Sequence, residues 1–196
     1  MPIFSLPSPY GIGTMGQAAR DFLDFLKAGG QSYWQLLPIG PTSYGDSPYQ
    51  SFSSFAGNPY FIDLDDLAAD GLLKPSEYQA LDWGADAQSV DYALLYQTRW
   101  PVLRLAVKRL LAEPPADYEA FLADNGDWLD NYALFMAIKG ENGGVSWQEW
   151  PEGCACAGRR TWPPPGPDWR SSWTSGGAYS TCFPAVGRAE GAGPGA

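Results

Sequence analysis

The sequence predicts an α/β fold, and a helix followed by a strand near the N-terminus is the first indication of it. Residues 16–28 are predicted to form an amphipathic helix, because one face carries the apolar residues Ala19, Phe22, Leu23 and Leu26 at helical spacing. Gly29-Gly30 ends this helix, and residues 32–39 are predicted to form a buried strand that Gly40-Pro41 stops. The second indication is the polar loop that follows directly, since α/β barrel units carry their functional residues on loops after strands.

Farther along the chain the pattern is mainly helical. Residues 58–64 are compatible with a short extended piece, and residues 65–70 with a helical turn that Gly71-Leu72-Leu73 ends. From Tyr92 to Leu111 we expect one helix, or two helices meeting at Pro101. The apolar residues that indicate it are Leu95, Val102, Leu103, Ala106, Val107 and Leu110.

Length, charge and composition limit the function classes. The chain has 196 residues, fewer than the roughly 250 of a complete (β/α)8 barrel. A net charge of −10 without a Lys or Arg cluster argues against a nucleic-acid partner. The absence of His excludes His-based triads and His-ligated zinc, and no metal or organic cofactor is suggested. With no apolar span of about 20 residues and no leader pattern, we expect no membrane partner and a cytoplasmic location.

The most informative segment is the loop from Tyr44 to Tyr60. It strings Gly, Pro, Ser and aromatic residues together, and Asp46 is its one charged residue. Gly and Pro fix the shape of a loop, Ser, Asn and Gln offer hydrogen bonds, and Tyr offers a flat face with a polar tip. This chemistry suits a neutral, polyhydroxylated ligand.

Three motifs in order carry a family resemblance. They are Ser5-Leu6-Pro7-Ser8-Pro9-Tyr10-Gly11-Ile12-Gly13, then Tyr33-Trp34-Gln35-Leu36-Leu37-Pro38-Ile39-Gly40-Pro41-Thr42, then the loop from Tyr44 to Tyr60. Together they resemble the amylomaltases, the disproportionating 4-alpha-glucanotransferases of glycoside hydrolase family 77. The resemblance runs almost unbroken from Ser5 to about Leu67 and loosens through Trp150.

The resemblance implies a fold and a reaction. The fold is a partial TIM (β/α)8 barrel, incomplete at both ends, with an inserted mainly helical subdomain. Residues 1–74 would be the N-terminal part of the catalytic barrel and residues 75–152 the insert, in which Asp127 is predicted to cap a helix through Lys139. The reaction is transfer of an alpha-1,4-glucan segment to another glucan or glucose, with retention through carboxylate chemistry. No position here matches the family's acidic catalytic motifs, so no catalytic residue is assigned.

The resemblance also implies the substrate-binding residues. Tyr44, Ser47 and Tyr49 match positions that contact sugar in relatives, so maltooligosaccharides or other alpha-1,4-glucans are the expected partners. Ser47 and Tyr49 would lie beside the acceptor end of the cleft, and Tyr44 in a secondary glucan groove. The alternative is that the tyrosines only pack the loop onto the barrel. For Asp46 we expect a turn formed with its own backbone in place of a catalytic role.

The character of the chain changes after Glu152. Residues 153–196 are rich in Gly and Pro, contain no Leu, Ile or Met, and hold all three cysteines, Cys154, Cys156 and Cys182. In GC-rich codons, residues 153–159 read from the third base give Leu-Arg-Leu-Arg-Arg-Pro. Residues 184–190, read from the second base, give Arg-Gln-Trp-Ala-Ala-Leu. We therefore expect a non-native or disordered tail from a shifted reading frame, in which the cysteines form neither a metal site nor a disulfide.

Other expectations concern the preceding residues. Only Met1-Pro2-Ile3-Phe4 stands before the first motif, where the family has a strand. Trp147 and Trp150 are expected to pack between helices, although stacking on sugar is the alternative. Two alternatives to an enzyme fragment also stay open: a non-catalytic carbohydrate-binding module and an inactive gene remnant. A cooperative melting transition that maltooligosaccharides protect would favour the module.

Overall fold

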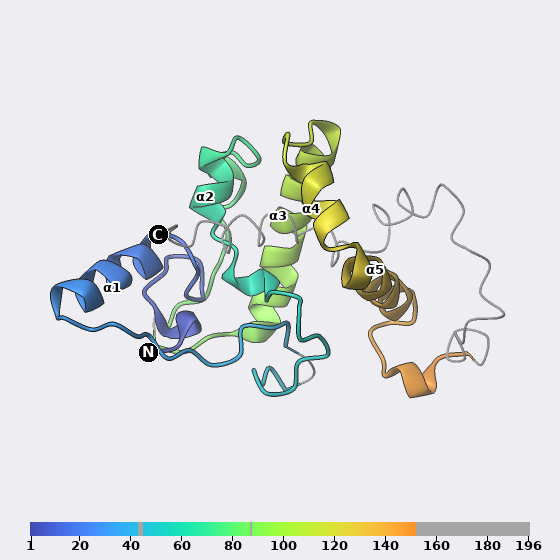
Figure 1. The fold of residues 1–196 in the computed structure, drawn as a ribbon, viewed down its shortest axis with the longest axis horizontal. Coiled ribbons are helices and arrows are strands. Elements are labelled where there is room, and N and C mark those ends of the chain that lie inside the picture. Colours follow the sequence, from blue (N-terminus) through green and yellow to red (C-terminus); the bar gives the residue numbers. More distant parts are fainter. Residues whose placement is uncertain (43–44, 87, 152–196) are drawn as a thin grey trace. The chain divides into compact units, whose positions relative to one another are not determined.

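A computed structural model describes residues 1–42, 45–86 and 88–151 (Figure 1). The described chain divides into a first compact unit, Met1–Pro114, and a second that begins at Pro115. Within these described residues the regular elements are all helical, and no β-strand is formed. The helical half of the predicted α/β fold is therefore present, whereas the predicted strand is not.

The first predicted helix is confirmed as α1, Gln17–Ala28. Its end has the expected cause, because Gly30 adopts a left-handed φ of +71° and its N–H donates to the Lys27 carbonyl. Its predicted apolar face is unevenly covered, since Ala19 is buried, Phe22 and Leu26 are half-buried and Leu23 is 49% exposed. Phe22 makes edge-on contact with Trp34, at 5.0 Å between ring centroids.

The predicted buried strand over residues 32–39 is wrong for the described structure. Tyr33 is 92% exposed, and the segment runs without regular structure from α1 toward the loop. A strand needs a neighbour to complete its ladder of hydrogen bonds. Among the described residues, the one backbone hydrogen bond that this segment makes to a distant part of the chain is accepted by the Ile39 carbonyl.

The predicted extended piece over residues 58–64 is also wrong. Its centre is the short 3₁₀ helix η2, Pro59–Phe61, and its end is the start of α2, Leu64–Ala69. Asn58 and Asp63 explain the difference, because each side chain accepts backbone N–H groups at the start of a helix. The helical turn predicted over residues 65–70 is confirmed by α2.

The long apolar segment forms one helix, α3, Tyr92–Ala112, with Pro101 inside it. Proline removes a hydrogen bond and disfavours the preceding turn. Packing compensates here, because both sides of Pro101 contribute buried residues to the first unit. Asp91 starts the helix by accepting the Leu94 N–H at 3.0 Å.

The core of the first unit joins segments that lie far apart in the sequence. It includes the short helix η1, Ile3–Ser5, the segment after it, α2, α3 and Tyr78. Its buried residues include Ile3, Leu6, Ile12, Leu64, Leu67, Tyr78, Leu95 and Leu103. A further short helix, η3, Pro75–Glu77, is tied to α3 by Arg109. The Arg109 guanidinium donates to both Glu77 carboxylate oxygens, at 2.6 and 2.7 Å, and to the Leu72 carbonyl.

The second unit contains α4, Tyr118–Asp124, α5, Gly126–Glu141, and η4, Trp147–Glu149. The predicted Asp127 cap is wrong: α5 already begins at Gly126, and Asp127 lies within its first turn. Asn125 ends α4 and accepts the Trp128 and Leu129 N–H groups through its carbonyl.

The two tryptophans near the end of the second unit differ. Trp150 is buried against Phe135, with ring centroids 5.5 Å apart, so its predicted packing role is confirmed. Trp147 remains about half exposed in η4, so packing does not account for this ring. The predicted tail after Glu152 and its cysteines lie outside the described residues.

Two kinds of feature are absent from the described residues. None of the helices there has the length and apolar character needed to cross a membrane. No group of His, Cys, Asp or Glu side chains in the same part of the chain is arranged to hold a metal ion.

Candidate functional site

The loop predicted to bind sugar is closed at its base by a backbone hydrogen bond. The Asn58 N–H donates to the Ile39 carbonyl at 2.8 Å, which brings together the two ends of residues 40–57. Gly40 permits the close approach of Ser51 to the backbone beside this closure, because a Cβ at Gly40 would lie 2.5 Å from Ser51 Oγ. The closure fixes the two ends of the loop, and its described residues 40–42 and 45–57 form no helix or strand.

Serine side chains fold the second half of this loop. Ser53 Oγ accepts the N–H groups of Phe55 and Ala56 at 3.2 and 3.0 Å, and Ser51 Oγ donates to the Ser53 carbonyl at 2.7 Å. Short side chains that bond to nearby backbone replace the missing secondary structure. The Ser-x-Ser spacing was visible in the sequence, although we predicted only general hydrogen-bonding capacity from it.

The predicted substrate-binding residues Ser47 and Tyr49 lie together in a turn. Ser47 is half-buried, its Oγ lies 3.4 Å from the Tyr49 N–H that donates to it, and its carbonyl accepts the Gln50 N–H at 3.1 Å. Tyr49 is 73% exposed, so its ring presents an open face. Tyr44, the third predicted residue, lies outside the described residues.

Asp46 is held in an unusual backbone conformation beside these residues. Its φ of +54° is the one left-handed value among described residues other than glycine. The predicted turn cannot be an Asx turn, because the Asp46 carboxylate would have to accept the N–H of the residue two ahead, and Pro48 has no N–H to donate. Partial burial raises the pKa of the Asp46 carboxyl.

The base of the loop also contains a cluster of aromatic side chains that was not predicted from the sequence. The Tyr60 ring lies 6.0 Å from Tyr92 and 5.9 Å from Trp100, which joins the base of the loop to the first half of α3. Burial raises the pKa of both tyrosines, and the negative charge of Asp46 adds to this effect. Their hydroxyls therefore stay protonated to a higher pH than that of an exposed tyrosine.

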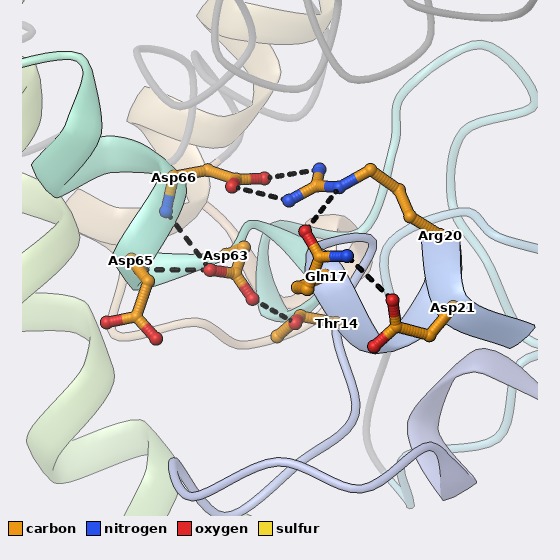
Figure 2. A network of polar contacts seen from close by, with 7 residues as sticks. All are labelled: Thr14, Gln17, Arg20, Asp21, Asp63, Asp65 and Asp66. Carbon is orange, nitrogen blue, oxygen red and sulfur yellow. Dashed lines mark hydrogen bonds and ion pairs between the residues drawn. The ribbon is translucent and has the colours of Figure 1, made fainter.

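The base of the loop is also fixed from the side of α1. The Met15 N–H donates to the Phe61 carbonyl at 2.9 Å. Figure 2 shows the neighbouring polar network, in which the Asp63 carboxylate accepts from the Thr14 hydroxyl and from the Asp65 and Asp66 N–H groups. On the other side of this network Arg20 of α1 forms a bidentate pair with Asp66 of α2, at 2.8 and 3.0 Å. These aspartates serve the structure of the base.

Asp65 turns its carboxylate away from this network (Figure 2) and bonds two tyrosines. The Tyr10 and Tyr78 hydroxyls both donate to its Oδ1, at 2.8 and 2.7 Å. Burial first, and then the bond to Asp65 and its charge, raise the pKa of Tyr10 to about 12. This arrangement ties the first sequence motif to α2.

The arrangement consists of an exposed tyrosine and a half-buried serine on a loop whose base is rigid. A flat aromatic face with nearby hydroxyl and backbone hydrogen-bonding groups is typical of surfaces that bind uncharged, polyhydroxylated ligands. The described residues of this loop thus combine an exposed aromatic face with a hydroxyl group, and they contain no paired carboxylates.

Comparison with known proteins gives the family. The model for the 4-alpha-glucanotransferases of glycoside hydrolase family 77 matches residues 1–161, and the chain belongs to this family. A 4-alpha-glucanotransferase of Streptococcus pneumoniae is 53% identical over 158 residues, and one of Thermus thermophilus is 52% identical over 151 residues. These alignments cover 80% and 75% of this chain.

A solved structure agrees with these relatives. An amylomaltase from Streptococcus agalactiae, in complex with acarbose, matches 96% of this chain with a TM-score of 0.83 and 37% sequence identity. The match covers 38% of that amylomaltase, and the two relatives above are covered over 31% and 29% of their length. The chain therefore spans about a third of the length of the relatives it matches.

Proposed function

We propose that the chain is part of a 4-alpha-glucanotransferase, which transfers a segment of an alpha-1,4-glucan to another glucan or to glucose with retention. The observation that supports this most strongly is the family match over residues 1–161, with relatives of that activity at 53% identity. Partners on this account are maltooligosaccharides and other alpha-1,4-glucans. A cytoplasmic location is part of the same proposal.

The role of this chain in that reaction is substrate binding. The exposed ring of Tyr49 stacks on a sugar face, and the Ser47 hydroxyl exchanges hydrogen bonds with sugar hydroxyls. Tyr44 joins them as a glucan contact of the same loop. The carboxylate nucleophile and the acid/base of the retaining mechanism belong to sequence that this chain does not contain.

The fold follows the same proposal. Residues 1–74 belong to a partial TIM (β/α)8 barrel that is incomplete at both ends. Residues 75–152 form the mainly helical subdomain inserted into the barrel. Residues 153–196 are the product of a shifted reading frame, which resequencing the gene across the Glu152 codon tests directly.

Two assays on the full chain test the function. We expect maltoheptaose to bind saturably in a calorimetric titration, and maltotriose to remain unconverted when the products are separated by chromatography. Absence of binding to a folded chain would contradict the binding role. Appearance of glucose and longer oligosaccharides would contradict the assignment of the catalytic carboxylates to sequence outside this chain.

A further inference from the structure

Arg99 is a fully buried cation, with a relative exposure of 0%, on the apolar face of α3. Leu95 and Leu103 stand one helical turn to either side of it at spacings of four, so the sequence pattern alone marks Arg99 as facing the core. Removing a charge from water is costly, and a hydrophobic residue of similar volume often serves stability as well or better. Core stability alone therefore does not account for an arginine at this position.

The contacts of the Arg99 guanidinium show what it joins. One terminal nitrogen donates to the Tyr10 carbonyl at 3.3 Å, and the other donates to the Ile62 carbonyl at 2.5 Å. The Cζ atom lies 5.9 Å from the centre of the Trp83 ring. A planar guanidinium carries its donors in a fixed fork and stacks on aromatic rings. It therefore sets the distance between the two carbonyls to which it donates.

Both carbonyls belong to segments that support the candidate site. Ile62 follows η2, directly after the buried base of the loop, and Tyr10 lies in the first sequence motif. The base is held through the backbone at Ile39 and Met15, and Arg99 ties it to α3. A shift of Ile62 would move the turn that carries Ser47 and Tyr49. The segment that connects this turn to Ile62 is held at its end by the Asn58–Ile39 hydrogen bond and along its length by the bonds to Ser53 Oγ.

We propose that Arg99 is a positioning residue for glucan binding, which acts by fixing the Ile62 and Tyr10 carbonyls and thereby the orientation of the loop that carries Tyr49. This inference rests on the proposed glucan-binding function. Arg99 does not contact the sugar. Its effect is on the placement of the groups that do, and a misplacement of about 1 Å can cost up to about 100-fold in a precisely built site.

Arg109 provides a matched control. It lies on the same helix and also donates to a backbone carbonyl, that of Leu72, but its ion pair with Glu77 supports η3 and not the loop. The experiment compares Arg99→Met, Arg99→Lys and Arg109→Met in the full chain. For each variant we measure the melting temperature, the Kd for maltoheptaose and the backbone hydrogen exchange of residues 58–63 and 72–78.

We expect Arg99→Met to weaken maltoheptaose binding by at least about tenfold at a temperature where the variant is still folded. Exchange should accelerate in residues 58–63 and stay unchanged in residues 72–78. Arg99→Lys should recover part of the affinity, because the ammonium still donates to the carbonyls but lacks the rigid fork. Arg109→Met should show the reverse exchange pattern and keep its affinity within about twofold of the starting chain.

Equal losses of affinity in Arg99→Met and Arg109→Met, at matched losses in melting temperature, would overturn the proposal and leave a structural role. If Arg99→Met fails to fold, Arg99→Lys decides, since unchanged exchange in residues 58–63 would contradict positioning. If the starting chain does not bind maltoheptaose, the proposed function fails. The exchange comparison then still decides whether Arg99 fixes the base of the loop.

Discussion

The base and the tip of the candidate loop are built in opposite ways. At the base, Asn58 is 5% exposed, and its neighbours through Ile62 are buried and hydrogen-bonded to three distant parts of the first unit. At the tip, Tyr49 is 73% exposed. Among the described residues, its backbone N–H donates a hydrogen bond to the Ser47 side chain, two residues before it. The difference teaches that a buried, hydrogen-bonded base supports an exposed aromatic ring, so we expect stability and the proposed glucan binding to depend on separate residues.

The largest effect should follow from emptying the core beneath the base. Leu64 is fully buried at the start of α2, and we expect Leu64→Ala to lower the free energy of unfolding by about 3 kcal/mol because it leaves a cavity. Urea denaturation of the full chain measures this loss. Leu23→Ala on the exposed face of α1 is the control and should cost less than about 1 kcal/mol. Similar losses in both variants would contradict a core centred on the base.

The second effect should come from the cap of η2. Asn58 Oδ1 accepts the Tyr60 N–H at 3.0 Å, and Asn58→Ala would leave this buried donor without its partner. We expect a loss of about 1–2 kcal/mol in the free energy of unfolding, measured in the same denaturation assay. Asn58→Asp keeps the acceptor and should lose less. An alanine variant as stable as the aspartate variant would show that the cap does not hold the base.

The tip should respond in binding and not in stability. Tyr49→Ala removes an exposed ring, so we expect the melting temperature to change little while maltoheptaose binds about tenfold more weakly. Tyr49→Phe keeps the ring face and should retain most of the affinity. Phe55→Ala removes another exposed ring of the same loop and is the control. Loss of affinity in Phe55→Ala and not in Tyr49→Ala would assign the sugar contact to a different part of the tip.

The smallest effect should be a pH dependence far from the tip. The hydrogen bonds from Arg109, and then that from the Lys74 backbone, lower the pKa of Glu77 from 4.5 to about 2. The stabilisation that Glu77 contributes is therefore complete above about pH 4.5 and is lost as the pH falls toward 2. Glu77→Gln should lower the melting temperature at pH 7, and the difference from the starting chain should shrink in that acid range. A difference independent of pH would contradict this ion pair.

The sequence predicted elements whose causes are local and missed those that need distant partners. The end of α1 followed from Gly29-Gly30, and the turn of α2 from its flanking residues. The strand over residues 32–39 was wrong because a ladder depends on a neighbour that the pattern of one segment does not reveal. The sequence left one helix or two open at Pro101, and the fold decides for one, because residues on both sides of Pro101 are buried and α3 is continuous.

The same division applies to the site. The composition of the loop indicated a binding surface, and its exposed Tyr49 fits that prediction, although its contact with sugar stays a prediction. Arg99 was missed despite its spacing from Leu95 and Leu103, because a cation on an apolar face has meaning only once its two carbonyl partners are known. The sequence can thus indicate which loop residues are exposed for binding, whereas the residues that support the loop are identified only from the fold.

Hydrogen exchange of the full chain with and without saturating maltoheptaose would test the central claim most directly, with cellohexaose as the control ligand. The account predicts slower exchange in residues 45–57 with maltoheptaose alone, and unchanged exchange in residues 72–78. A folded chain in which maltoheptaose leaves residues 45–57 unchanged would contradict the claim that this loop binds alpha-1,4-glucan.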